Sequence, residues 1–240
     1  MRLDQLILDR HPQLSRNYIQ SLIMQGKVRV EDTIISKAGT PVHVDAVIVL
    51  ATEEPKFVSR AGFKLEKALD YFSLDVNNLI ALDAGLSTGG FTDCLLQRGI
   101  EKVYGVDVGY GQVHEKIRIN PKVIIMDRTN LRLLESLPEL VDLVTLDLSF
   151  ISVLKVIDNV KRFMKPGAKL IVLIKPQFEA ERHEVGKGGI IKSSEIHEKV
   201  INNVITGITD AGFICHGFIE SPILGTEGNK EFLAYFERKI

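Results

Sequence analysis

The sequence predicts an α/β protein in which a small α+β unit precedes a mostly parallel sheet that ends in an antiparallel hairpin. Three observations predict it. Between residues 79 and 210, short apolar runs alternate with amphipathic stretches, which is typical of a parallel sheet with helices on both faces. The last two apolar runs, 213–220 and 232–237, have only a glycine-containing loop between them. The first 50 residues show a different pattern and are followed by a polar stretch that contains Pro55.

The first unit, residues 1–50, is expected to hold two helices and then strands. Apolar residues at helical spacing predict the helices, and alternating apolar and charged residues predict the strands. The expected elements, in order, are a helix over 2–8, a helix capped by Ser15 and ended by Gly26, and strands over 27–30 and 42–49.

Residues 51–58 are expected to form a linker, and residues 59–240 a second, larger domain. The expected elements of this domain, in order, are a helix over 59–71, a strand over 79–82, a helix over 92–97, strands over 102–106, 123–126 and 143–146, a helix over 151–163, a strand over 170–174, a helix over 194–210, and the two strands of the closing hairpin. The charged, glycine-containing stretch 179–194 predicts a mobile loop beside the site.

The composition excludes several classes of protein. With 45% hydrophobic and 25% charged residues, the chain resembles a soluble globular protein. Its net charge of −1 means that any RNA-binding face must be a local patch. Cys94 and Cys215 lie far apart and the six histidines show no ligand spacing, so no metal site is predicted. No secretory signal is visible and no apolar run approaches the about 18 residues of a membrane span, so the cytoplasm is the expected location.

The stretch from Asp83 to Asp93 carries the clearest ligand-binding pattern. An apolar run ends in an acid, a glycine-rich turn follows, and a helix then begins, whose free N–H groups suit an anionic part of a ligand. The glycine spacing, Gly-x-x-x-Gly-Gly, differs from the dinucleotide fingerprint and from the phosphate loop. The turn therefore predicts a site for a nucleoside-like ligand without a pyrophosphate, and S-adenosylmethionine is the candidate cofactor. The turn contributes Gly85, Ser87, Thr88, Gly89, Gly90 and Phe91 to this site.

Three acids end three consecutive predicted strands. Asp83 is expected to bind the methionine amine of the cofactor. Asp107 follows it by 24 residues, close to the offset of about 20 at which an acid binds ribose hydroxyls in nucleotide-binding sheets. Asp127 is expected to accept a hydrogen bond from the adenine amino group. A single acid in such a place is often just a turn or helix-cap residue, but three acids beside the glycine turn favour the ligand site.

The first 50 residues resemble the RNA-binding domain first described in ribosomal small-subunit protein four. The resemblance is carried by the stretches 2–4, 15–16, 26–30 and 45–49, together with Ile19. It implies that two helices and the following turn present cations to an RNA backbone, whereas each cation taken alone could be a solvated surface charge. The implied RNA-binding residues are Arg2, Arg16, Lys27 and Arg29.

Over essentially its full length the chain resembles the TlyA family of ribosomal RNA 2′-O-methyltransferases, relatives of the FtsJ methyltransferase that often carry the name hemolysin A. The resemblance is carried, in order, by the stretches 59–65, 83–93, 146–150, 174–179 and 228–232. Leu86 departs from the family, which usually has a small residue there. The resemblance implies a Rossmann-like methyltransferase sheet, ribosomal RNA or a ribosomal subunit as partner, and a catalytic tetrad. The tetrad maps to Lys64, Asp147, Lys175 and Glu231.

The chemistry of a ribose 2′-hydroxyl is consistent with this tetrad. The hydroxyl must lose its proton as it attacks a sulfonium methyl group, and a lysine can accept that proton once a neighbouring ammonium and partial burial lower its pKa. Lys175 is expected to be the base and Lys64 to depress its pKa and position the substrate, while Asp147 and Glu231 orient the lysines. Lys64 lies just off the apolar stripe of its predicted helix, where a solvated lysine is equally ordinary.

Three alternatives remain at the level of the sequence. A membrane-active hemolysin is suggested by the family's other name, but no spanning segment and no strongly amphipathic cationic helix is apparent. An RNA-binding accessory protein without catalysis is disfavoured by the intact tetrad. A nicotinamide-dependent dehydrogenase is disfavoured by the glycine spacing.

Overall fold

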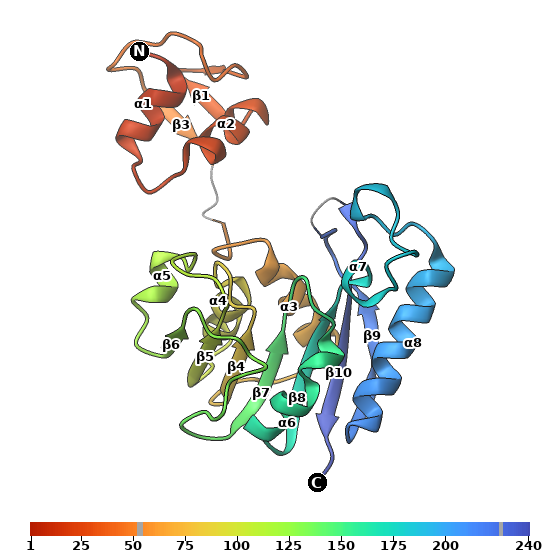
Figure 1. Ribbon diagram of the computed structural model, residues 1–240. Coiled ribbons are helices and arrows are strands. Elements are labelled where there is room, and N and C mark those ends of the chain that lie inside the picture. Colours follow the sequence, from red (N-terminus) through yellow and green to blue (C-terminus); the bar gives the residue numbers. More distant parts are fainter. Residues whose placement is uncertain (52–54, 226–227) are drawn as a thin grey trace. The chain divides into compact units, whose positions relative to one another are not determined.

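The computed structural model describes residues 1–51, 55–225 and 228–240, and it divides into two compact units, Met1–Lys56 and Phe57–Ile240 (Figure 1). The boundary falls inside the stretch 51–58 that was expected to be a linker. Residues 52–54 of that stretch lie outside the described residues. No helix in the described part of the chain is long and apolar enough to cross a membrane.

In the first unit, two helices pack on a small antiparallel sheet. The helices are α1 (Leu3–Arg10) and α2 (Arg16–Met24), and the strands are β1 (Val28–Val30), β2 (Thr33–Ile34) and β3 (Ile48–Leu50), in the order β2-β1-β3. Ser15 caps α2 by accepting a hydrogen bond from the Tyr18 amide, as the sequence predicts. The expected strand over 42–49 is wrong in extent, because pairing with β1 starts only at Ile48. The short strand β2 was not expected.

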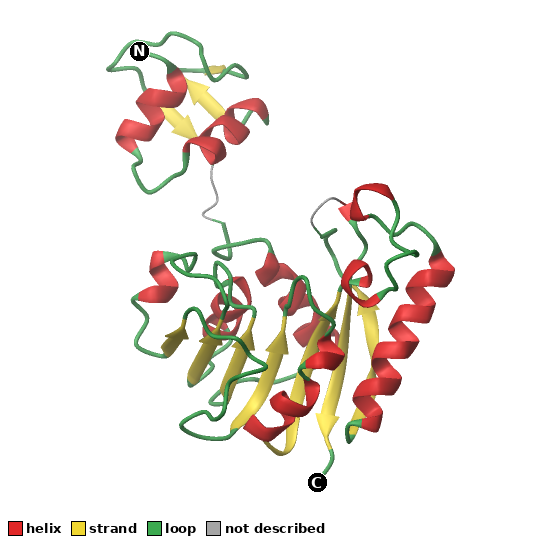
Figure 2. Cartoon of the chain, in the orientation of Figure 1, coloured by secondary structure: helices red, strands yellow, loops and turns green. Residues whose placement is uncertain are grey.

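The second unit is a seven-stranded sheet flanked by helices (Figure 2). Its elements, in order, are α3 (Ala61–Tyr71), β4 (Ile80–Ala84), α4 (Gly90–Gln97), β5 (Lys102–Val106), α5 (Glu115–Arg118), β6 (Val123–Met126), β7 (Val141–Leu146), η1 (Val153–Lys155), α6 (Ile157–Phe163), β8 (Met164–Ile174), α7 (Pro176–Glu179), η2 (Lys187–Gly189), α8 (Ser194–Asp210), β9 (Phe213–Glu220) and β10 (Phe232–Arg238). The helix expected over 151–163 is interrupted at Val156, and β8 starts six residues before the predicted strand.

The strand order, β6-β5-β4-β7-β8-β10-β9, explains where a ligand can bind. The chain runs outward from β4 to β6 and then returns to β7 on the other side of β4, and these four strands and β8 are parallel. The order therefore reverses at β4, and ligands of open α/β sheets bind beyond the carboxyl end of such a switch point. The glycine turn after β4 lies at this place.

The closing hairpin is antiparallel, as predicted, and its second strand β10 lies between β8 and β9. Alternate residues of β10 face opposite sides of the sheet. Leu233 and Tyr235 pack on the side of α3 and α4, whereas Phe232, Ala234 and Phe236 pack on the side of α6 and α8. Both faces of the sheet are thus buried, and its carboxyl edge is left for chemistry.

Candidate active site

The glycine turn packs tightly against its surroundings. Gly85 has φ +87°, and a Cβ there would lie 2.2 Å from the backbone oxygen of Asp147. Gly89 has φ +93°, and a Cβ at Gly90 would lie 2.2 Å from Ser59 Oγ. Only glycine fits these positions, so the turn brings the start of α4 close to Asp147 and Ser59.

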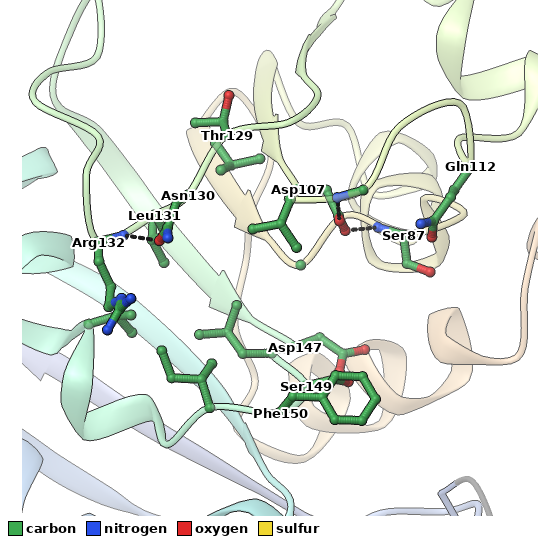
Figure 3. A pocket seen from close by; sticks show the side chains of 17 residues that line it. Ser87, Asp107, Gln112, Thr129, Asn130, Leu131, Arg132, Asp147, Ser149 and Phe150 are labelled. Atoms are coloured by element: carbon green, nitrogen blue, oxygen red, sulfur yellow. Dashed lines mark hydrogen bonds between the residues drawn. The ribbon is translucent and has the colours of Figure 1, made fainter.

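A cavity of about 520 Å³ lies beside this turn, at the carboxyl ends of β4, β5 and β7 (Figure 3). Ser87 and Asp107 line one side of it, and Asp147, Ser149 and Phe150 line the other. The cavity is large enough for a nucleoside-sized ligand.

Asp107 is held in place by the backbone. Its carboxylate accepts hydrogen bonds from the Ser87 amide at 2.8 Å and from the Gly109 amide at 2.7 Å. Each carboxylate oxygen retains a further lone pair, and the residue lines the cavity. Its placement therefore suits the ribose hydroxyls that the sequence assigned to it.

Asp83 does not reach the cavity. Its side chain is fully buried, and its two oxygens accept hydrogen bonds from the Thr92 hydroxyl at 2.6 Å and the Thr145 hydroxyl at 2.8 Å. Burial raises its pKa to about 6, against the effect of these hydrogen bonds. Both oxygens thus fasten α4 and β7 to β4, and the contact with a methionine amine stays a prediction.

Asp127 also lies outside the lining of the cavity. Its carboxylate accepts a 3.4 Å hydrogen bond from the Gly111 amide. Thr129, Asn130 and Leu131 line the wall where an adenine contact was expected. The adenine-binding role of Asp127 therefore stays a prediction, and Thr129 and Asn130 are the polar residues of this wall that do line the cavity.

The rest of the turn contributes in different ways. Thr88 and Phe91 line a smaller cavity of about 80 Å³, which shares Gly85, Ser87 and Asp147 with the first cavity. Gly89 is the N-cap of α4 and packs against Ile117. Leu86, the departure from the family pattern, is 2% exposed and lies in an apolar cluster with Val113 and Ile117. Its bulk is therefore accommodated beneath the turn.

Two oxygens without a hydrogen bond face this smaller cavity. Ser59 Oγ and Asp147 Oδ1 are buried, and neither has a hydrogen-bond partner among the described residues. Buried polar atoms in native proteins are normally paired. Asp147 Oδ1 has an ionic partner in Lys175, so Ser59 Oγ is the oxygen at this cavity that could accept a hydrogen bond from a polar ligand group.

The four residues of the predicted tetrad form two ion pairs at the carboxyl edge of the sheet. Lys64 Nζ lies 2.5 Å from Glu231 Oε2, and Lys175 Nζ lies 2.6 Å from Asp147 Oδ1. Lys64 is 8% exposed and Glu231 is 2% exposed, so Lys64 is not a solvated lysine. Such burial of charge is tolerated only because each partner neutralises the other.

The Lys175 amine contacts Ser149 and Asp147 in two different ways. Its Nζ donates a hydrogen bond to Ser149 Oγ at 3.0 Å, whereas its contact with Asp147 Oδ1 is close in distance but does not have the angles of a hydrogen bond. Asp147 therefore acts on Lys175 through charge, and Ser149 fixes the direction in which the amine points.

A second cavity, of about 310 Å³, connects these groups to the surface. Lys175, Glu231 and Ser149 line it together with Phe150 and Phe178. The two rings pack with centroids 5.1 Å apart, and Phe150 is 90% exposed. Ser149 and Phe150 line both large cavities, and Lys175, which lines the second, donates a hydrogen bond to Ser149.

The sequence did not single out Ser59, Ser149 or Asn130 as individual site residues. Ser59 and Ser149 do lie within the stretches 59–65 and 146–150 that carry the family resemblance. Across the residues that the structure describes, no group of three or more histidine, cysteine, aspartate or glutamate side chains could hold a metal ion.

In the first unit, the four predicted RNA-binding cations are exposed. Arg2 and Arg16 both bind the carboxylate of Asp4, which is completely buried. Arg29 lies on β1, paired across the sheet with Ile34 and Val49.

Comparisons with known proteins agree with this geometry. The family model of FtsJ-like methyltransferases matches residues 57–238, and that of the S4 domain matches residues 1–48. Hemolysin A of Brachyspira hyodysenteriae is 41% identical, over 98% of this chain and 99% of that protein. The 16S/23S rRNA (cytidine-2'-O)-methyltransferase TlyA of Mycobacterium tuberculosis is 37% identical, over 98% of this chain and 88% of that protein.

Solved structures resemble the chain as well. A hemolysin-type protein from Streptococcus thermophilus has a TM-score of 0.78 and 37% identity, covering 100% of this chain and 88% of that one. An S-adenosylmethionine-dependent methyltransferase from Mesorhizobium loti has a TM-score of 0.54 at 16% identity, covering 72% of this chain and 96% of that one, and so shows the fold alone.

Proposed function

The chain belongs to the FtsJ-like methyltransferase family, whose cofactor is S-adenosylmethionine, and we propose that it methylates a ribose 2′-hydroxyl of ribosomal RNA. One observation carries the proposal. Lys175 lines the second cavity, which shares Ser149 and Phe150 with the nucleoside-sized cavity beside the glycine turn. One cavity suits the cofactor, and the other suits a nucleotide of the substrate.

The residues around the first cavity fit the cofactor. Asp107 would accept hydrogen bonds from its ribose hydroxyls, and the amide groups at the start of α4 would bind its carboxylate. The Ser59 hydroxyl oxygen, which has no hydrogen-bond partner among the described residues, would accept a hydrogen bond from its ammonium group. When bound, S-adenosylmethionine supplies a methyl group on a positively charged sulfur.

The tetrad then has a clear chemical task. As the 2′-oxygen would form its bond to the methyl carbon and the carbon–sulfur bond would break, the hydroxyl proton would pass to the Lys175 amine, which accepts a proton only in its neutral form. Ser149 orients this amine by accepting one of its N–H groups, which leaves the nitrogen lone pair free for the substrate proton. Asp147 stabilises the ammonium that results. Glu231 holds Lys64 beside the same cavity, where it would bind a substrate oxygen.

An RNA substrate is favoured by two further features. The first unit matches the S4 domain and exposes four cations that suit RNA phosphates. The exposed Phe150 at the rim of the second cavity suits an unstacked base. The relative named for cytidine-2′-O methylation of 16S and 23S rRNA makes cytidine the first nucleoside to test. A ribosomal RNA substrate would place the protein in the cytoplasm.

The proposal is tested by incubating purified protein with isolated ribosomal subunits and S-adenosylmethionine labelled in the methyl group. We expect label in ribosomal RNA, and none in ribosomal protein. Transfer to protein alone, or no transfer to either subunit, would contradict the proposal.

A relative at 41% identity is named Hemolysin A, so lysis of red cells is the second function to test. Purified protein is added to washed red cells with and without S-adenosylmethionine. Lysis that is independent of the cofactor would support a membrane-active function, and intact cells would contradict it.

A further inference from the structure

Asp4 is a completely buried carboxylate near the start of α1, in the S4-type unit. Arg2 donates to it from Nε at 2.9 Å and from Nη2 at 3.0 Å. Arg16 Nη2 donates at 3.3 Å, and Gln20 Nε2 at 3.0 Å. The Gln5 amide donates at 3.1 Å. Side chains from the amino-terminal segment and from α2 thus converge on one carboxylate.

The backbone around this carboxylate is fixed as well. The Asp4 amide donates to the Ala38 oxygen, and the Leu3 amide donates to the Thr40 oxygen. The Arg2 guanidinium lies against Gly39, where an added Cβ would be 3.5 Å from its Cζ. The hydrogen bond from Arg2 is the main cause that holds the pKa of Asp4 well below its usual range, so the carboxylate stays ionised.

Both arginines remain available to a ligand. Their side chains are 56% and 54% exposed. A guanidinium has five N–H donors. Arg2 uses two of its nitrogens on Asp4 and Arg16 uses one, so the outer edges of both groups still carry free donors. Both groups bind the same oxygen, Oδ2, and they are therefore neighbours.

We propose that Asp4 is a positioning residue that holds Arg2 and Arg16 together as a receptor for one RNA phosphodiester. Two neighbouring guanidinium groups repel each other and are flexible when unpaired, and the buried carboxylate removes both obstacles to a paired arrangement. Two positive charges and one negative charge leave a net charge of +1, which matches a single phosphodiester. The planar fork of arginine suits this ligand better than a lysine ammonium does.

This inference rests on the proposed function in taking RNA as the ligand, but it is independent of catalysis. The two possible roles of Asp4 predict opposite effects of Asp4→Asn on RNA affinity. If the cations acted only through bulk charge, Asp4→Asn would strengthen RNA binding because the net charge rises by one. If Asp4 positions them, the same change weakens RNA binding.

The test measures filter binding of the full-length protein to transcripts of 16S and 23S ribosomal RNA at fixed salt. Asp4→Asn is expected to bind roughly tenfold more weakly, the size of one lost charge-assisted contact. Asp32→Asn, an exposed acid in the turn between β1 and β2, gives the same change in net charge and is expected to bind as tightly as the wild type or slightly more tightly. Equal affinities of the two variants would overturn the proposal.

A second variant tests the proposal even if Asp4→Asn does not fold. The double substitution Arg2→Lys and Arg16→Lys keeps Asp4 and the total charge, and it changes only half-exposed side chains. It is expected to weaken binding by a similar factor, since it removes the planar forks. Wild-type affinity would again overturn the proposal. This experiment measures RNA affinity and not methyl transfer. A wild-type protein that binds RNA but does not methylate it would contradict the proposed function, and the comparison of RNA affinities among the variants would still test the role of Asp4.

Discussion

Replacing Asp83 by asparagine separates a structural role for this acid from a role in cofactor binding. Asparagine has nearly the same shape, and it can pair with the hydroxyls of Thr92 and Thr145 through one acceptor and one donor. It removes only the charge, which burial disfavours.

The expected size follows from the pKa of about 6 against the ordinary 3.8. Because the folded state holds this proton more tightly than the unfolded state, the wild type loses stability as the pH rises from about 4 to about 6. The shift corresponds to roughly 3 kcal/mol. By about pH 7 both states are almost fully ionised at this position, so the loss of stability is then nearly complete and no longer depends on pH. Asparagine does not ionise, so the variant does not lose this stability as the pH rises.

The assay is thermal unfolding of wild type and Asp83→Asn between pH 4 and pH 8. The two proteins are expected to be similar at pH 4, and the variant should gain roughly 3 kcal/mol relative to the wild type by pH 7. At about 2–4 °C per kcal/mol, the gain corresponds to a rise in Tm of about 6–12 °C.

Calorimetric titration with S-adenosylmethionine completes the test. Because Asp83 does not line the cavity, the variant should bind the cofactor with an affinity close to that of the wild type. A folded variant that has lost cofactor affinity, or a stability difference that does not change with pH, would refute the structural role.

Three other changes test further parts of the account. Glu231→Gln leaves a buried lysine without its charge partner, so it should lower the free energy of unfolding, measured by urea denaturation, by about 3–5 kcal/mol. Glu220→Gln breaks an exposed ion pair and should lower the same free energy by less than about 1 kcal/mol. Gly90→Ala places a Cβ 2.2 Å from a buried hydroxyl oxygen and should weaken cofactor binding by at least about tenfold in calorimetry. Gly39→Ala in the first unit, where an added Cβ would keep an ordinary contact of 3.5 Å, should not weaken it. Removal of residues 1–55 should weaken RNA binding and flatten its salt dependence, and an unchanged salt titration would exclude a role for this unit.

The sequence predicts the architecture well where the physical signal is local. The alternation of strands and helices, the closing hairpin and the Ser15 cap all follow from periodicity and short-range hydrogen bonding. The position of β10 between β8 and β9 does not, because it depends on pairing between strands about 60 residues apart. Neither does the early start of β8, since Pro166 and Gly167 normally end a strand.

In the site, too, local features could be predicted from the sequence and long-range contacts could not. The glycine turn and Asp107 are recognisable from spacing alone. The helical pattern leaves Lys64 ambiguous, and only its ion pair with Glu231, 167 residues away, shows that it is buried and held. For Asp83 the sequence identifies an acid at a strand end, but the direction of its oxygens depends on threonines from two other elements.

The measurement closest to the central claim is mass spectrometry of nucleosides from ribosomal RNA that has been treated with the protein and S-adenosylmethionine. Wild type is expected to produce a 2′-O-methylnucleoside. Lys175→Ala, which keeps the cofactor cavity, is expected to bind the cofactor and produce none. Methylation on a base, or a 2′-O-methylnucleoside formed by Lys175→Ala at the wild-type rate, would contradict the account.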